Sequence, residues 1–222
     1  MKYQPLARQL FLILLFFGVC ANSPLAAQGA RDGDASHQAL RRELIKMGKE
    51  DQKYRNELVA LMKRLTEPDN QEVTKKYAAV WKKQTAIDKK LLKRLEEIIQ
   101  KYGWPTINMV GAEASETAFL IVQHADPASQ KKYFPLLKQA AARKEARPDH
   151  VAMMEDRILM NEGKKQIYGT GLQTDDITKG LKLWPIENEE EVDARRAAVG
   201  LPPMAEYLKV IGLKYNPPKK ND

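Results

Sequence analysis

The sequence predicts a mainly α-helical protein, and three observations support this. Apolar residues recur at intervals of three and four from Leu40 to Leu65. The same interval returns from Val73 to Tyr102, after a short interruption at Pro68–Asn70. Later stretches with this period are shorter and are separated by proline and glycine. We therefore expect a long antiparallel helical hairpin, three further helices, a short two-stranded β-ribbon and two short C-terminal helices.

The first 27 residues have the order of charges and apolar residues that is typical of a bacterial signal peptide. Lys2 and Arg8 precede an apolar run from Leu10 to Val19, and small residues follow at Ala21 and at 26–27. The run of about ten residues is too short to span a bilayer, which takes roughly 20. We expect an exported protein, periplasmic or extracellular, with no transmembrane segment in its mature chain.

Cys20 is the only cysteine of the chain, and it lies within the predicted signal peptide. Cleavage after Ala27 or after Ala21 removes it, so the mature protein is expected to contain no disulfide. A lipid-modified Cys20 is the less favoured alternative, because Val19 stands where lipoprotein processing usually needs a small residue.

The charge distribution argues against nucleic acid as a partner. Loss of Lys2 and Arg8 lowers the net charge from +8 to about +6. Charges of both signs are mixed along the mature chain, and no basic run is interleaved with aromatic residues. A well-solvated surface and attraction to anionic envelope polymers are the two interpretations that remain.

The mature chain is predicted to form one domain. A small, polar leader is expected at residues 28–36, a single mostly helical domain at 37–212 and a disordered tail at 213–222.

Capping residues delimit the elements of this domain. Gly103-Trp104-Pro105 ends the second helix in a turn that buries Trp104. Small residues from Ala114 to Ala125 mark a third helix, able to approach a neighbour closely. Pro127 begins a fourth helix, and a fifth runs from Pro148 to Gly163.

A change of pattern after Gly163 predicts the ribbon and the C-terminal helices. Residues 166–170 and 181–186 are expected to be its two strands. Asn188 and Glu191 resemble a capping box for the next helix, and Pro202-Pro203 introduces the last.

Polar residues interrupt the apolar stripes of the predicted hairpin. Asp51 and Arg55 share one face of its first helix, and Gln84 and Asp88 lie in the stripe of its second. If the hairpin turns near Asp69, Asp51 lies opposite Asp88. Two adjacent carboxylates can share a proton, hold a ligand, or form an ion-pair network with Arg55 that fixes the register.

His124 ends the third helix, where the helix dipole favours its charged form. It is either a stabilising residue of this terminus or a proton carrier. No second histidine or cysteine stands at metal-ligand spacing, so we predict neither a metal site nor a cofactor.

Two further groups of polar residues are candidates for a binding site. Asp156 and Arg157 are adjacent in the fifth helix and point about 100° apart, so at least one should reach another element. In a strand, Gln166, Tyr168 and Thr170 would share one face, which either lines a pocket or is the wet side of the ribbon.

No standard catalytic signature is present in the sequence. We therefore predict a noncatalytic envelope domain that binds a small molecule, a glycan or an envelope protein, or that is structural. The alternative is a hydrolase-like enzyme that uses His124 with Asp51 or Asp88. The candidate ligand-binding residues are Arg55, Trp104, Asp156, Arg157, Gln166, Tyr168 and Thr170.

Several short motifs, taken together, resemble a bacterial family of unknown function, family 6624. They are Asp88, Gly103-Trp104-Pro105, Gly111, Ala114, Gln123-His124-Ala125-Asp126, Gln130, Asp156-Arg157, Gly163, Gln166, Tyr168-Gly169-Thr170, Asp193, Arg195-Arg196 and Gly200-Leu201. The resemblance extends from about Asp51 to Leu208. Gly171 and Phe119 depart from the pattern, which usually has glutamine and often tryptophan there. The resemblance implies a common domain but no activity.

Overall fold

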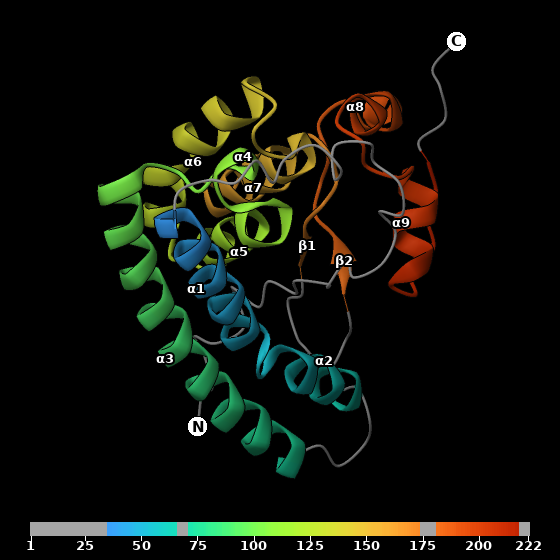
Figure 1. Ribbon diagram of the computed structural model, residues 1–222. Coiled ribbons are helices and arrows are strands. Elements are labelled where there is room, and N and C mark those ends of the chain that lie inside the picture. Colours follow the sequence, from blue (N-terminus) through green and yellow to red (C-terminus); the bar gives the residue numbers. More distant parts are fainter. Residues whose placement is uncertain (1–34, 66–70, 174–180, 218–222) are drawn as a thin grey trace. The chain divides into compact units, whose positions relative to one another are not determined.

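The computed structural model describes residues 35–65, 71–173 and 181–217, and it is mainly helical, as the sequence predicts (Figure 1). The chain divides into two compact units, one ending at Arg147 and the other beginning at Pro148, and each is described by itself. The predicted signal peptide and the turn at Pro68–Asn70 lie outside the described residues. In the described ranges, no helix is both long and apolar enough to cross a bilayer.

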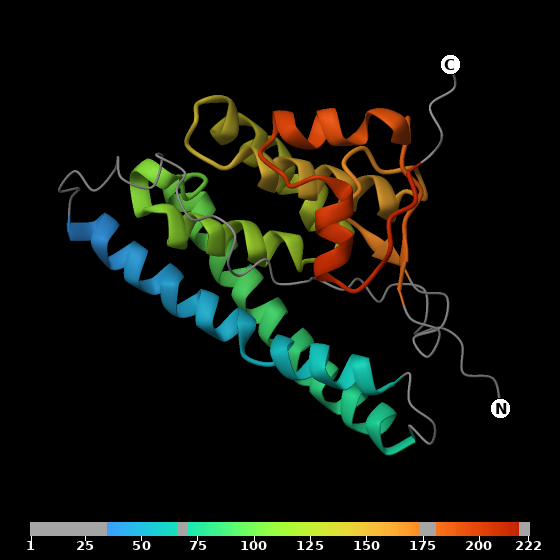
Figure 2. The same ribbon diagram turned by 90° about the vertical axis from the view of Figure 1, so that its right-hand side faces the viewer.

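The helical hairpin belongs to the first unit. Helices α1 (Ala35–Gln52) and α2 (Arg55–Arg64) follow one another along the long helix α3 (Gln71–Tyr102), as Figures 1 and 2 show. The predicted apolar stripes supply most of the buried apolar residues of this hairpin, which are Leu40, Leu44, Met47, Leu58, Leu65, Val73, Leu91, Leu95 and Ile98; Leu61 and Val80 are buried as well. The prediction of one continuous first helix is wrong, because the helix is interrupted at Lys53 and Tyr54.

Helix α5 (Ala112–Gln123) is buried along most of its length and packs against α1. The two helices approach closely at Gly48, where an added Cβ would lie 2.5 Å from Oγ1 of Thr117. Ala114 and Ala118 are fully buried, as expected from the small residues of this helix. A short helix that the sequence reading missed, α4 (Ile107–Val110), precedes α5.

The predicted ends of α3 and α6 are confirmed. Gly103 adopts a φ of +77°, the left-handed conformation that glycine accommodates most easily, and Trp104 after it is buried. Helix α6 (Pro127–Ala142) starts at Pro127. The carboxylate of Asp126 caps it by accepting hydrogen bonds from the N–H groups of Ala128 and Ser129.

The second unit begins with helix α7 (Pro148–Asn161) and contains the predicted antiparallel ribbon. The ribbon's first strand is shifted from its predicted place. Strand β1 (Leu172–Gln173) pairs with β2 (Lys182–Leu183), whereas residues 166–170 form a loop. Gln166 at the start of this loop forms an isolated parallel bridge with Ile186, beyond the end of β2.

The C-terminal helices pack around an apolar cluster. The 3-10 helix η3 (Glu189–Glu191), α8 (Val192–Ala198) and α9 (Met204–Val210) follow the ribbon. The cluster consists of Leu172, Ile186, Val192, Met204, Tyr207 and Leu208, with Leu213 and Tyr215 packed against it. The predicted capping box is wrong, because Asn188 is left-handed, with a φ of +43°, and its side chain makes no capping hydrogen bond.

Candidate functional site

The interruption between α1 and α2 is held by one side chain from α3. Gln84 is completely buried; its Nε2 donates to the carbonyl of Asp51 at 2.9 Å, and its Oε1 accepts from the N–H of Tyr54 at 3.3 Å. A helix break leaves backbone groups without their helical partners, and burying such groups unpaired is costly. Gln84 therefore replaces two backbone interactions at the point where the helix is broken.

Asp51, two residues before the break, is surrounded by donors. Nη2 of Arg55 lies 3.1 Å from Oδ1, and Nε of Arg55 lies 3.3 Å from Oδ2. Nε2 of Gln52 donates to Oδ2 at 2.6 Å. The Asp51 side chain is only 1% exposed, so its charge is compensated by protein groups rather than by bulk water.

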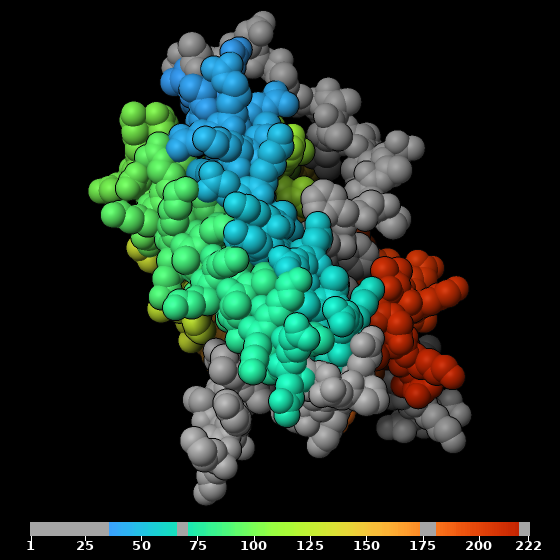
Figure 3. All heavy atoms as spheres, turned by 90° about the horizontal axis from the view of Figure 1, so that it is seen from below, coloured from blue at the N-terminus to red at the C-terminus, as the bar shows by residue number. Residues whose placement is uncertain are grey.

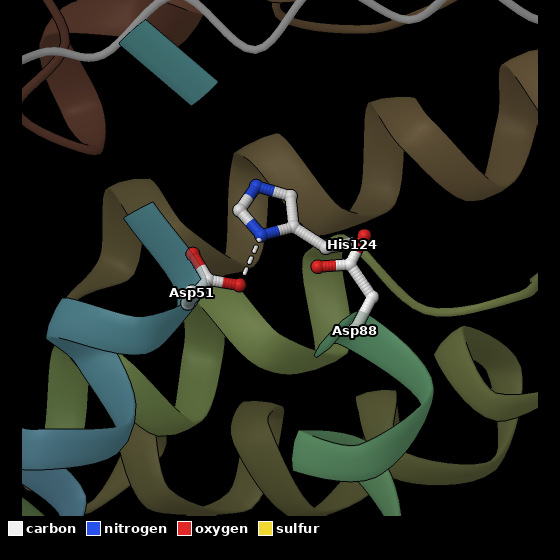
Figure 4. Close-up of side chains that lie close together, drawn as sticks. All are labelled: Asp51, Asp88 and His124. Atoms are coloured by element: carbon white, nitrogen blue, oxygen red, sulfur yellow. Dashed lines mark hydrogen bonds and ion pairs between the residues drawn. The ribbon is translucent and has the colours of Figure 1, made fainter. Parts of the chain in front are cut away.

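His124 reaches the same carboxylate from the C-terminal end of α5. Its Nδ1 lies 2.8 Å from Oδ1 of Asp51, and its side chain is 1% exposed (Figure 4). An ionised carboxylate can only accept, so Nδ1 is the donor in this hydrogen bond. The histidine that the sequence placed at a helix terminus therefore contacts a residue from the hairpin.

Asp88, on α3, completes the group. Its Oδ1 accepts from Nη2 of Arg55 at 2.6 Å and from Nε2 of Gln84 at 2.8 Å. The guanidinium of Arg55 thus bridges the two carboxylates of Asp51 and Asp88, which the predicted hairpin register placed together. We call Asp51, Arg55, Gln84, Asp88 and His124 the polar cluster.

The two carboxyl groups of the polar cluster respond differently to burial. Burial opposes the ionisation of Asp51, but attraction and hydrogen bonding by His124 and Arg55 outweigh it and hold the pKa of Asp51 well below its usual range. Burial raises the pKa of Asp88 to about 6, and the charge of Asp51 adds to this effect, while Arg55 and Gln84 oppose it. Asp88 therefore titrates near neutral pH.

Asp51, Asp88 and His124 each offer one possible metal ligand, and these three atoms lie within 4.8 Å of one another. The sequence search missed this set because it looked for histidine and cysteine at fixed spacings, whereas these residues come from three helices. Arg55 already supplies a positive charge to both carboxylates. The absence of a metal site stays a prediction.

In the second unit, Asp156 organises the loop that was predicted to be a strand. Its Oδ1 accepts from the N–H groups of Ile167 and Tyr168, and its Oδ2 accepts from the N–H and hydroxyl of Thr170. Backbone donors that converge on one carboxylate cannot also form a β-ladder. The loop replaces the strand for this reason.

The prediction that Gln166, Tyr168 and Thr170 share one polar face is therefore wrong. Gln166 is completely buried and uses its amide on the backbone of Gly171 and Trp184. The hydroxyl of Thr170 is bound to Asp156. These groups hold the loop in shape.

Two arginines that sequence reasoning did not select as site residues hold the same loop from its carbonyl side. Arg195 donates to the carbonyl of Ile167, and Arg196 donates to that of Tyr168. Arg196 is 1% exposed and lies over the ring of Tyr207. The one feature of the sequence that pointed to these arginines was Arg195-Arg196 among the short motifs shared with family 6624.

Of the remaining candidates, Tyr168 is half-buried, whereas Arg157 and Trp104 are buried. Arg157 lies in α7 beside Asp156 and is 9% exposed. Trp104 is 5% exposed, and within the described residues its Nε1 has no hydrogen-bond partner.

A family model described as "Family of unknown function (DUF6624)" matches residues 38–217. The chain belongs to this family. The DUF6624 match includes all five residues of the polar cluster and the loop around Asp156. Neither the curated proteins nor the solved structures contain a match to the chain. Membership in DUF6624 thus groups these residues in one family and assigns them no activity.

Proposed function

We propose that this protein is an exported, noncatalytic domain of the bacterial envelope, in which the polar cluster locks the broken helix α1–α2 against α3 and α5. The observation that carries the proposal is the surroundings of Asp51. Its carboxylate is buried, and both oxygens are occupied by donors from the chain itself, including Arg55 and His124. A carboxylate in this state has little capacity left to bind a substrate.

The energetics of buried charges support the same role. Removing one partner from a buried ion pair costs about 3–5 kcal/mol, because the other charge is left uncompensated. Asp51 is the partner of both Arg55 and His124, whereas Asp88 is 16% exposed and has a raised pKa. The stabilising contribution of the cluster is therefore expected to depend mainly on Asp51.

Two isosteric substitutions test this role. Asp51→Asn should lower the free energy of unfolding at about pH 7.5 by about 3–5 kcal/mol. Asp88→Asn should change it far less, because the charged form of Asp88 is disfavoured by burial. Denaturant unfolding followed by circular dichroism measures both.

Glu50→Gln is the matched control, since Glu50 is next to Asp51 in the sequence. Its side chain is 33% exposed, and its ion pair within the described part of the chain is with the exposed Lys90. A cluster that merely decorates the hairpin would give equal, small changes in all three variants. That result would contradict the proposed structural role.

A second candidate function is acid–base catalysis, as in a hydrolase. It is favoured by the 2.8 Å contact between His124 and Asp51, in which a carboxylate orients an imidazole, and by the pKa of about 6 at Asp88. Gln166 and Thr170, two of the candidate ligand-binding residues, are already bound by the chain itself. Gln166 donates to the carbonyl of Trp184, and the hydroxyl of Thr170 donates to Asp156.

Nitrophenyl esters, phosphates and glycosides provide a direct assay of this second candidate. Hydrolysis that His124→Ala abolishes and Glu50→Gln retains would establish it. Equal turnover by the wild type and His124→Ala, or none by the wild type, would count against it.

A further inference from the structure

The exposed face of α3 carries a regular row of lysines. Between Gln71 and Lys93 the helix contains seven of them, at positions 75, 76, 82, 83, 89, 90 and 93, and all seven are exposed. The pairs 75–76, 82–83 and 89–90 repeat every seven residues, which is about two helical turns, so they project from the same side. We call these seven residues the lysine row.

The lysine row is not balanced by nearby acids. The only acidic residues of α3 in this stretch are Glu72, at its start, and Asp88, which belongs to the polar cluster. Glu57 pairs with Lys76, and Glu50 pairs with Lys90. The lysines at positions 75, 82, 83, 89 and 93 form no ion pair with any other described residue.

Uncompensated like charges on one helix face repel one another and lower its stability. They also produce a positive potential that attracts anions. Figure 3, viewed from below, shows α3 in green, uncovered along much of its length beside α1 and α2. The lysine row is thus a continuous basic surface that the first unit itself does not neutralise.

The row has the shape of a line. Lys93 lies 18 positions after Lys75 along the helix, which is about 27 Å at about 1.5 Å per residue. Exposed Ala79 and Ala86 lie between the lysine pairs. Among the described residues, the large hydrophobic side chain that is exposed is Val210, and it lies on α9 rather than on α3. The lysine row therefore offers no large apolar side chain to enter a bilayer.

We propose that the lysine row is a binding surface for a linear anionic polysaccharide. A chain with a charge on successive sugars complements a line of point charges, whereas a membrane-binding helix normally adds an apolar face. The row consists of lysines rather than arginines, so it lacks the forked geometry that recognises single phosphates in a bidentate manner. Binding is therefore distributed along the polymer and sensitive to salt.

Fluorescence anisotropy with fluorescein-labelled alginate, a linear polyuronate, tests the proposal on the whole protein. The variant Lys75→Gln, Lys82→Gln, Lys89→Gln, Lys93→Gln should bind about tenfold more weakly or worse at about 20 mM NaCl. Wild-type affinity should fall steeply between about 20 and 200 mM NaCl, as charges become screened. The double variant Lys82→Gln, Lys89→Gln should show a smaller loss of affinity for alginate. It replaces the fourfold variant in the test if that variant folds poorly.

A matched control removes the same charge elsewhere: Lys49→Gln, Lys138→Gln, Lys209→Gln, Lys214→Gln, all at exposed positions. The proposal predicts near wild-type affinity for this control. Equal losses in both fourfold variants would show that only net charge matters, and absence of salt-sensitive binding would also overturn the proposal. Preferential binding to vesicles of phosphatidylcholine with phosphatidylglycerol would assign the row to a membrane surface and overturn it as well.

Discussion

Asp51 and Asp88 share the guanidinium of Arg55, but they differ in how many other donors they receive. Asp51 has His124 and Gln52 in addition, whereas the remaining donor to Asp88 is the neutral amide of Gln84. Burial disfavours the charged form of both groups. The compensating donors therefore keep Asp51 charged in mild acid, whereas Asp88 takes up a proton below about pH 6.

This difference predicts the pH dependence of stability. Asp88 has a pKa of about 6 in the folded protein and an ordinary value of 3.8, so the folded state binds more protons between these pH values. Stability should therefore rise as the pH falls from about 6 to about 4, by at most about 3 kcal/mol. Asp51 has a lowered pKa, so its contribution is present above about pH 4 and is lost in stronger acid.

The effect of Asp88 is measured by urea unfolding of the wild type and of Asp88→Asn at about pH 7 and about pH 4.5. The substitution should remove most of the gain in stability on acidification. Glu97→Gln, which removes an exposed carboxylate from the same helix, should leave the gain intact. An unchanged gain in Asp88→Asn would show that another group titrates in this range.

We expect Arg55 to prevent the polar cluster from accepting a metal ion. Its guanidinium contacts both carboxylates that could act as ligands. In Arg55→Ala, two carboxylates and His124 would remain without that cation, in an arrangement suited to a divalent metal. Zinc should therefore raise the melting temperature of Arg55→Ala more than that of the wild type, as measured by differential scanning fluorimetry with and without EDTA. An equal response of the two proteins would contradict this role of Arg55.

At the scale of the helices, some features follow from local patterns. The hairpin and the proximity of Asp51 to Asp88 could be predicted because charged residues stood in apolar stripes on both helices. The positions of Gly103 and Pro127 were sufficient to predict the end of α3 and the start of α6.

Other features depend on contacts between distant residues. The break at Lys53–Tyr54 contains no proline or glycine, and it requires Gln84, which is 30 residues from Tyr54. The loop at 166–170 has the composition of a strand, but its backbone N–H groups bend around the carboxylate of Asp156, which lies on α7. The polar cluster was predicted only in part for the same reason, since the contact of His124 with Asp51 joins residues 73 positions apart.

The packing of α5 against α1 gives a prediction at this scale. Gly48→Ala would improve the intrinsic helix propensity of α1 by about 1 kcal/mol, but its Cβ would lie 2.5 Å from Oγ1 of Thr117. We expect a net loss of about 1–3 kcal/mol in unfolding free energy, because the two helices must move apart.

Thr117→Ala provides the matching test, because it removes the two closest atoms and leaves the Cβ of residue 117 at 3.5 Å. In the Thr117→Ala background, Gly48→Ala should therefore lower the free energy of unfolding much less than it does in the wild type. Additive losses in this double-mutant cycle would show that the close contact is not the cause.

At the scale of the whole molecule, the first unit differs in how it treats charge in its interior and on its exterior. Its interior contains the polar cluster, whose charges are compensated by groups of the chain itself. Its exterior carries the lysine row, in which the lysines at positions 76 and 90 are the two that form ion pairs with other described residues. This arrangement fits the proposed role of a noncatalytic envelope protein, because under that proposal the cluster holds in place the helix on which the lysine row is displayed.

The proposed export involves the chain as a whole. Expression of the full sequence in a Gram-negative host should yield a processed protein in the periplasmic fraction or the medium. Intact-mass measurement should place its first residue at Gln28 or at Asn22, after cleavage at Ala27 or Ala21. The processed protein then contains no cysteine, so its mass should be unchanged by thiol-alkylating reagents. Leu14→Arg should retain the unprocessed chain in the cytoplasm, because a charge in the apolar run blocks its insertion. An unprocessed wild-type protein in the cytoplasm, or a mass increased by a lipid at Cys20, would contradict this maturation route.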